Sequence, residues 1–224
     1  MKTATSLTSL PQKKVTTGLK RLQEAGITPE RWLAMLDADA ASMQRLADVW
    51  PVRLPSFTYY DAVAILGFGE ASTEPLPEPA PGEIIIRVGD WSLQDLRDSK
   101  IGKELMHQQD WYDKYDCASA KLTAGIYRVR LPVPDSNRKN LTEQKGLLLS
   151  DEEVAPVALG ASALLVHLKE TGNDLLKNNW CRCEEALPDD YHVGLNVNDG
   201  RVYVDYDWDD YRCDRLWLSA ARKF

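Results

Sequence analysis

The stretch STEPLPEPAPG, residues 72–82, divides this chain of 224 residues into a front part with helical patterns and a back part with many strand patterns. Four of its eleven residues are prolines. Because proline fixes the backbone φ angle and removes a hydrogen-bond donor, neither a helix nor a central strand can run through this stretch. The sequence therefore predicts an α+β protein with a helical domain over 1–70, a Pro-rich linker over 71–82 and an α+β domain over 83–224.

The front part has the pattern of a small helical bundle. Apolar residues recur at helical spacing over 19–25, 29–36 and 39–50, and cap or stop residues such as Gly26 and Thr28-Pro29 separate these segments. We therefore predict three short helices. The apolar run Tyr59–Leu66 fits either a buried strand or a helix that packs on the bundle, and we favour the helix.

The back part mixes short strand patterns with helical ones. Strands are expected over 83–88 and 125–131, with helical periodicity over 91–108 between them. A longer helix is expected from Pro156 to a C-cap at Gly172. The Asp-Gly step at 199–200 predicts a β-hairpin of 192–197 with 201–206, and 215–220 has the pattern of a last strand. Together these patterns predict a mainly antiparallel sheet with a long helix packed on it.

Charge and hydropathy limit the classes of function. The net charge is −7, and because residues 1–55 hold eight Lys and Arg against five Asp and Glu, the rest of the chain carries −10. This balance argues against a protein that coats nucleic acid by bulk electrostatics. No window approaches the ~18–20 apolar residues of a membrane span, and residues 1–11 lack the apolar run of a signal peptide. We therefore expect a cytoplasmic protein without membrane contact, whose four cysteines are reduced thiols.

The densest acidic stretch is DYDWDD at 205–210. On a strand, the period of two places Asp205, Asp207 and Asp209 on one face about 7 Å apart. Such a face is a candidate site for Mg²⁺ or Ca²⁺, which prefer oxygen ligands. The alternative is a solvated strand edge whose charges oppose aggregation.

The cysteines do not have the spacing of a zinc site. Cys181 and Cys183 are separated by one residue, whereas structural zinc sites usually place two to four residues between paired cysteines. A catalytic cysteine–histidine pair stays open, since the two residues need only be close in space. We predict no cofactor.

Cations gather around the loop PVPDSNRKN at 132–140. Arg128 and Arg130 lie on the strand before it, and its turn chemistry presents Arg138 and Lys139 to an anion or an acidic partner. The loop lacks the glycines of a phosphate-binding loop. Large aromatic residues, Trp208 among them, favour either cross-strand packing or a recognition surface. The candidate binding residues are therefore these four cations and Trp208.

One part of the back half resembles a recurrent pattern in uncharacterised bacterial proteins. The resemblance rests on GIYRVRLPVPDSNRK at 125–139, Glu143-Gln144 and EEVAP at 152–156. It implies that the 132–140 loop belongs to a family architecture. It implies no activity, ligand or fold.

No nucleophile, base and orienting group can be assembled from these residues, so the chain does not have the pattern of an enzyme. Our leading hypothesis is a non-catalytic accessory protein that binds a macromolecular partner, a protein, through its aromatic face and the 132–140 loop. One alternative is a DNA-binding regulator, because residues 13–37 have the outline of a helix-turn-helix. The other is a hydrolase or nuclease that depends on a divalent metal held by Asp205, Asp207 and Asp209.

Overall fold

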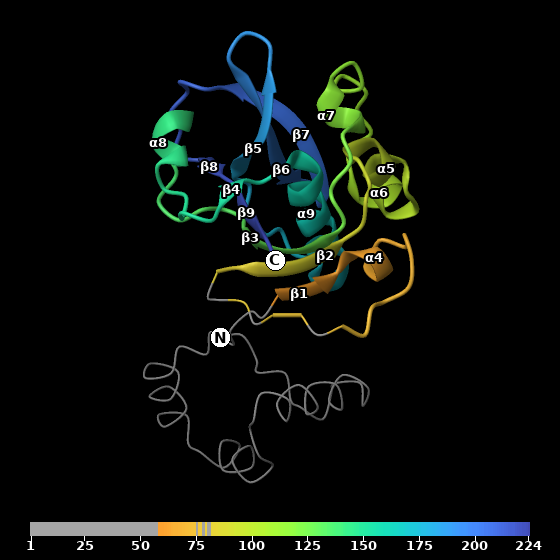
Figure 1. The fold of residues 1–224 in the computed structure, drawn as a ribbon. Helices are drawn as coiled ribbons and strands as arrows, with labels where there is room; N and C mark the ends of the chain where they lie inside the picture. Colours follow the sequence, from red (N-terminus) through yellow and green to blue (C-terminus); the bar gives the residue numbers. More distant parts are fainter. Residues whose placement is uncertain (1–57, 75, 78, 80–81) are drawn as a thin grey trace, which may run out of the picture. The chain divides into compact units, whose positions relative to one another are not determined.

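A computed structural model of the chain describes residues 58–74, 76–77, 79 and 82–224 (Figure 1). They belong to one compact unit that begins at Pro55. The three helices predicted in the front part and the helix-turn-helix outline at 13–37 lie outside the described residues. The α+β class is confirmed. The sequence predicted one mainly antiparallel sheet, whereas the structure has two mixed sheets in which five of the seven pairs of neighbouring strands are antiparallel.

The first sheet has five strands in the order β1-β2-β3-β9-β4. Their bounds are Thr58–Asp61 (β1), Ile84–Val88 (β2), Gly125–Arg130 (β3), Ala220–Lys223 (β9) and Glu153–Val154 (β4). Strands β1 and β2 run parallel, and the other neighbours are antiparallel. All five residues of β2 are buried, as expected for an inner strand covered on both faces.

The second sheet has four strands in the order β7-β6-β5-β8. Their bounds are Arg201–Trp208 (β7), Tyr191–Asn198 (β6), Trp180–Leu187 (β5) and Leu216–Leu218 (β8). Strands β6 and β7 form the predicted hairpin, with Asp199 and Gly200 both at positive φ in its turn. This is the backbone geometry that an Asp-Gly step favours, because such a turn matches the strand twist.

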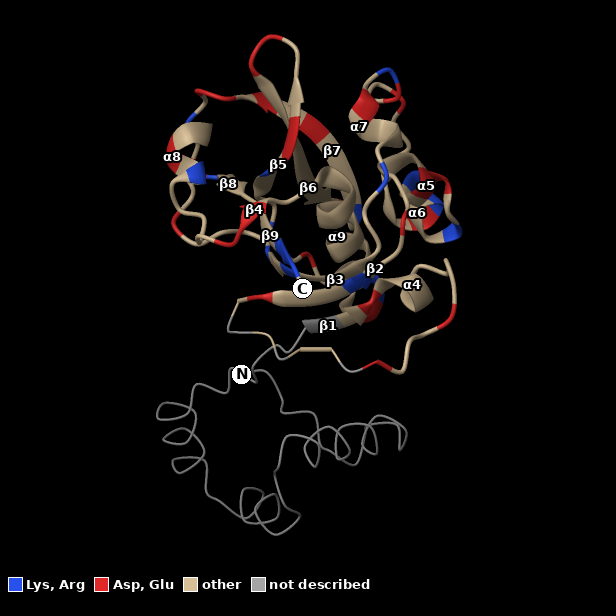
Figure 2. Cartoon of the chain, viewed as in Figure 1, with Lys and Arg blue, Asp and Glu red and all other residues tan. Residues whose placement is uncertain are grey.

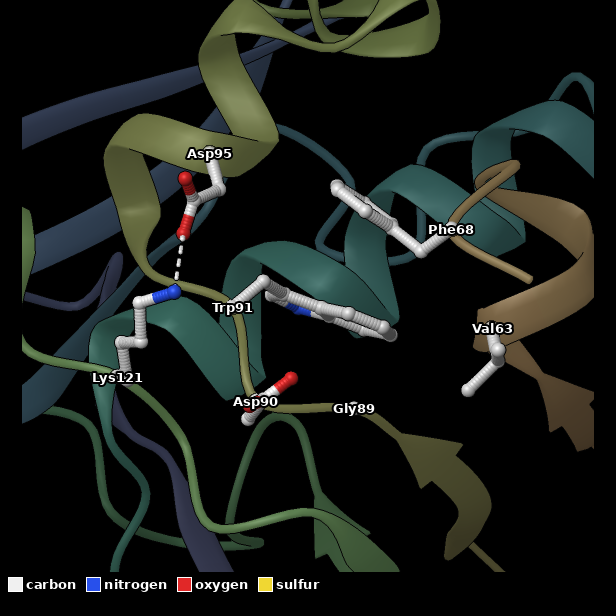
Figure 3. Close-up of a pocket in the computed structure, with 7 residues that line it drawn as sticks. All are labelled: Val63, Phe68, Gly89, Asp90, Trp91, Asp95 and Lys121. Carbon is white, nitrogen blue, oxygen red and sulfur yellow. Dashed lines mark ion pairs between the residues drawn. The ribbon is translucent and has the colours of Figure 1, made fainter.

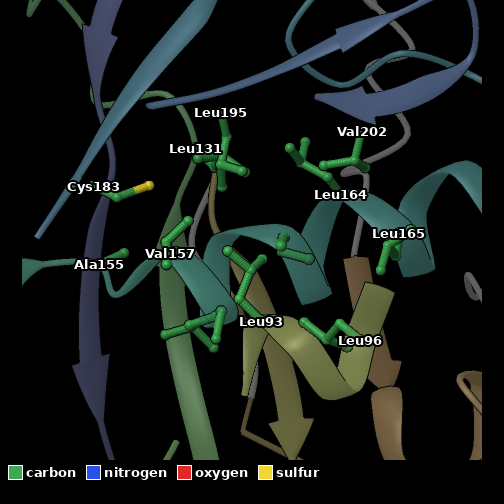
Figure 4. Close-up of a cluster of buried hydrophobic side chains, with 14 of the residues drawn as sticks. Leu93, Leu96, Leu131, Ala155, Val157, Leu164, Leu165, Cys183, Leu195 and Val202 are labelled. Atoms are coloured by element: carbon green, nitrogen blue, oxygen red, sulfur yellow. The ribbon is translucent and has the colours of Figure 1, made fainter. Parts of the chain in front are cut away.

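Helix α9 (Val157–Thr171) lies at the centre of the core (Figure 4). It packs against β2 of the first sheet and against β5, β6 and β7 of the second. Eleven of its fifteen residues are buried, so the helix is covered nearly all round. Its predicted ends are confirmed, since Pro156 is the N-cap and Gly172 closes the helix in the left-handed conformation.

Among the described residues, five short helices lie around this core, with bounds Ala62–Ile65 (α4), Leu93–Asp98 (α5), Lys100–Leu105 (α6), Asp116–Ser119 (α7) and Leu141–Lys145 (α8). Helices α4, α5 and α6 pack against α9. Ser92 and Asp95 form a capping box at the start of α5, and Asn140 and Glu143 form one at the start of α8. These reciprocal bonds satisfy the backbone donors that each helix start leaves free.

The predicted helix over Tyr59–Leu66 is wrong in its first half. Residues Thr58–Asp61 form strand β1, and the helix occupies only Ala62–Ile65. Asp61 ends the strand because its side chain accepts a hydrogen bond from Ala64 N as the N-cap of α4. The pairing of β1 with β2 places this segment in a sheet of the back part, although the sequence analysis grouped it with the front helices.

The predicted last strand over 215–220 is two strands. The chain leaves the second sheet after Leu218 and enters the first sheet at Ala220. Between them Ser219 is fully buried and donates from its Oγ to Arg182 O at 2.6 Å. In the described part of the chain, no helix is long and apolar enough to cross a membrane.

Candidate functional site

Three aromatic side chains lie at the end of the β6–β7 hairpin away from its turn. The register pairs Tyr191 with Trp208 and Val193 with Tyr206. Because side chains alternate along a strand, Tyr206 and Trp208 lie on the face of β7 that also carries Val204, which is in the core. Their rings make a chain of contacts, with centroids 5.0 Å apart for Tyr191 and Tyr206 and 5.4 Å apart for Tyr191 and Trp208.

A segment from elsewhere in the sequence completes this cluster. After α6 the chain runs along the edge of β7, where His107 N donates to Val202 O at 2.9 Å and Trp111 Nε1 donates to Val204 O at 3.3 Å. This places the Trp111 ring 5.1 Å from Tyr206 and 6.2 Å from Tyr115. We call the resulting set the aromatic surface: Trp111, Tyr115, Tyr191, Tyr206 and Trp208.

Part of the aromatic surface is open to solvent. Tyr206 is 45% exposed and Trp208 is 56% exposed, whereas Tyr112 and Trp91 are 0% and 4% exposed. Burying an aromatic ring is strongly favourable, so rings left exposed together mark a surface where another molecule can be bound. The exposure of Trp208 is therefore compatible with its predicted role as a binding residue.

The segments that carry the aromatic surface are rich in acidic residues (Figure 2). The segments that carry it, 110–116 and 189–211, contain ten acidic residues and two cations. Burial raises the pKa of Asp205 and of Asp207. One of the two cations, Lys114, lies with its Nζ 5.0 Å from the centre of the Tyr115 ring, so the chain itself already holds a cation against this surface.

Arg182 of β5 fixes the end of the strand that carries Trp208. Its side chain is fully buried, and it donates to Gln144 Oε1 at 2.9 Å, to Tyr211 O at 2.9 Å and to Trp208 O. Burial lowers the pKa of Arg182, opposed by Asp207 and Asp209. Its Nε has no hydrogen-bond partner among the described residues. The acceptors of this guanidinium are an amide oxygen and backbone carbonyl oxygens, and no carboxylate of a described residue is bonded to it directly.

A second polar contact supports the same region. His192 Nδ1 lies 2.6 Å from Asp209 Oδ1, and His192 is buried. Neither Arg182 nor His192 is among the candidate residues predicted from the sequence. The one available signal was a lone arginine inside the apolar pattern of β5, since arginine is rarely buried without partners.

The predicted cationic residues do not form one group. In β3, Arg128 pairs with Glu83 at 3.1 Å, and Arg130 donates from Nε to Glu152 at 2.7 Å. Both guanidinium groups are therefore engaged by carboxylates within the first sheet. The 132–140 loop lies against the second sheet instead, where Arg138 N donates to Cys213 O at 2.8 Å and Lys139 O accepts from Arg182. The Arg138 side chain is exposed and that of Lys139 is half-buried.

Comparison of the chain with protein-family models, with curated proteins and with solved structures gives no match. The expected resemblance to uncharacterised bacterial proteins stays untested, and it assigns no role to any residue. The surface has to be interpreted from its own chemistry.

The predicted metal site is not assembled. Asp205 and Asp207 lie in β7, whereas Asp209 follows the strand and is bonded to His192. Among the described residues, no three His, Cys, Asp or Glu side chains are grouped as a metal-ion site requires. Asp205 and Asp207 instead lie half-buried on the face of β7 opposite Tyr206 and Trp208.

The cysteines have the character of structural thiols. All four are free, and Cys117, Cys181 and Cys183 are buried. Burial raises the pKa of Cys117 to about 11 and raises the pKa of the other two still further from the ordinary value. Because the thiolate is the reactive form, these side chains are poor nucleophiles at neutral pH.

Proposed function

We propose that the unit formed by the described residues is a non-catalytic protein-binding module. Its aromatic surface takes a lysine- and arginine-rich segment of a partner protein. The observation that carries the proposal is the joint exposure of Tyr206 and Trp208 in a part of the chain whose segments, 110–116 and 189–211, are rich in acidic residues.

The chemistry of the surface selects a cationic segment. Lysine and arginine side chains are attracted to the faces of tryptophan and tyrosine, and their charge is met by the surrounding carboxylates. Arg97 illustrates this within the chain, since its guanidinium lies 5.4 Å from the Tyr112 ring and 2.7 Å from Asp113. A cationic side chain of a partner would likewise contact an aromatic ring and a carboxylate at the same time.

The same charge disfavours other occupants. A second copy of the chain would bring an equally acidic surface against this one, and like charges in contact are costly. Nucleic acid would be repelled for the same reason. DNA binding through residues 13–37 stays a separate prediction, because those residues lie outside the described part of the chain.

The experiment measures binding of defined peptides to the full-length protein by calorimetry. The probe is a twelve-residue peptide of alternating Arg, Lys and Leu, and its counterpart has Glu at every cationic position. We expect only the cationic peptide to bind. Trp208→Ala is expected to weaken binding by about 30-fold, the loss that corresponds to a hot spot of about 2 kcal/mol.

Leu149→Ala is the matched control. Leu149 is 55% exposed, almost the same as Trp208, but it lies between α8 and β4. Its replacement should leave the affinity unchanged. Equal affinity for both peptides, or equal effects of the two variants, would contradict the proposed function. Replacing Arg138 and Lys139 together by Ser tests whether the 132–140 loop makes a second contact.

A further inference from the structure

A second candidate site lies at the carboxyl ends of the parallel strands β1 and β2. The chain leaves β1 into α4 and leaves β2 through a short loop into α5. Between these connections is a hollow of about 340 Å³, which is lined by Val63, Phe68, Gly89, Asp90, Trp91, Asp95 and Lys121 (Figure 3). The volume is at the small end of the range for ligand pockets.

The aromatic wall of this pocket is held rigidly. Trp91 Nε1 donates to Ser162 Oγ of α9 at 2.9 Å, and the Phe68 ring stacks on the Trp91 ring with centroids 4.6 Å apart. Gly89 leaves room for the indole, because a Cβ atom there would lie 2.8 Å from Trp91 Cζ3. Trp91 is buried and Phe68 is 39% exposed, so the stack presents Phe68 on a fixed base.

The pocket is lined by two carboxylates, Asp90 and Asp95, and by one ammonium group, Lys121. Asp95 accepts hydrogen bonds from Ser92 N and Ser92 Oγ and lies 3.8 Å from Lys121 Nζ. The backbone hydrogen bond from Ser92 lowers the pKa of Asp95. Asp90 is exposed, and its carboxylate has no hydrogen bond or ion pair with any described residue. Lys121 is therefore offset by Asp95, and the charge of Asp90 is left uncompensated beside aromatic rings.

We propose that this pocket binds a small organic ammonium ion. The ammonium group pairs with the Asp90 carboxylate, and the apolar part of the ligand lies against Phe68 and Val63. An aromatic face adds attraction for the cation. An anionic ligand of the same size would meet two carboxylates and a single lysine that is already paired.

The experiment titrates three probes of similar size into the full-length protein and follows them by ligand-observed NMR. The probes are 2-phenylethylammonium, the neutral 2-phenylethanol and the anionic 3-phenylpropionate. We expect the ammonium ion to bind with a Kd on the order of 1 mM, as its small size allows, and the carboxylate not to bind. Equal binding of all three probes, or binding of none, would overturn the proposal.

Two variants locate the bound probe. Asp90→Asn should weaken binding of 2-phenylethylammonium about tenfold, corresponding to ~1.4 kcal/mol, and should leave 2-phenylethanol unaffected. Asp199→Asn removes another exposed acid, in the β6–β7 turn, where asparagine tolerates the positive φ, and should change nothing. An effect of the two replacements that is equal in size would show a general response to charge and overturn the proposal.

The aromatic surface also attracts cations, so Trp208→Ala is a necessary second control. If the pocket is the site, this variant keeps the affinity of the native protein for 2-phenylethylammonium. If Trp208→Ala abolishes binding and Asp90→Asn does not, the probe lies on the aromatic surface and the pocket proposal fails. The peptide titration and the small-probe titration can therefore fail independently.

Discussion

At the scale of single residues, Arg182 has the largest expected effect on stability. Arg182→Lys keeps the positive charge, but a lysine ammonium cannot reach Gln144, Trp208 and Tyr211 together as the planar guanidinium does. Some of these three oxygens, Gln144 Oε1, Trp208 O and Tyr211 O, would then lose the hydrogen-bond donor that Arg182 supplies. We expect the free energy of unfolding to fall by about 3 kcal/mol, measured by urea denaturation.

The matched control is Arg212→Lys. Arg212 pairs with Glu143 at 2.7 Å, and both side chains are about half exposed, so this change should cost less than about 0.5 kcal/mol. Hydrogen exchange should quicken at 139–144 and 208–212 in the Arg182 variant alone. Equal destabilisation by the two variants, or unchanged exchange in these segments, would contradict the anchoring role of Arg182.

The residues predicted as candidates show what local patterns cannot determine. The sequence places Arg128 and Arg130 on a strand correctly, but their carboxylate partners Glu83 and Glu152 come from separate segments. No local pattern reports such a pairing. The same holds for Asp209, whose bond to His192 depends on the hairpin register and on the turn that follows β7.

At the scale of elements, helix α9 begins at a carboxylate that another element supplies. Val157 N donates to both oxygens of Glu185 in β5 at 2.9 Å. Burial raises the pKa of Glu185 from 4.5 to about 7, although the bond from Val157 opposes the shift. Because the pKa in the folded state is above that in the unfolded state, the folded protein binds more protons between about pH 4.5 and 7. Stability is therefore highest below this range and falls as the pH rises through 7.

Glu185→Gln tests this dependence. Glutamine keeps a carbonyl oxygen for Val157 N but cannot ionise, so the part of the pH dependence that Glu185 causes should disappear. That part is at most about 3 kcal/mol between pH 4.5 and 8, because the pKa of Glu185 rises from 4.5 to about 7. Urea denaturation at pH 5 and pH 8 measures it, with the exposed Glu70→Gln as control. A difference between the two pH values that is the same in Glu185→Gln and the native protein would contradict the assignment.

Elements with strong local signals could be predicted from the sequence, and those defined by distant pairing could not. Helix α9 was located by its apolar periodicity and by Gly172, and the β6–β7 hairpin by its Asp-Gly turn. Strand β1 was missed because four residues of an apolar run carry no period that separates a strand from a helix. The partition into β8 and β9 was missed because one buried serine, Ser219, moves the chain between sheets.

At the scale of the whole molecule, Arg87 of β2 joins two segments that precede it in the sequence. This side chain is 9% exposed, and its guanidinium bonds Asp61 Oδ2 at 3.1 Å and Glu74 O at 3.0 Å. Asp61 ends β1, and Glu74 lies at the start of the Pro-rich stretch. Segments on both sides of the predicted domain boundary at 82/83 are therefore joined through one buried cation.

Two truncated chains test whether the folded unit begins at residue 55 or at residue 83. A chain of residues 55–224 keeps β1, Asp61 and Glu74, and we expect it to unfold cooperatively with the stability of the full-length protein. A chain of residues 83–224 leaves β2, whose five residues are all buried, as an open edge and leaves Arg87 without either partner. The loss should be about 5 kcal/mol or more, comparable to the whole stability of a domain, so this chain should aggregate or stay unfolded. Size-exclusion chromatography and thermal unfolding followed by circular dichroism distinguish the two. Native-like unfolding of 83–224 would show that β1 and Arg87 contribute little, and would support the boundary expected from the prolines alone.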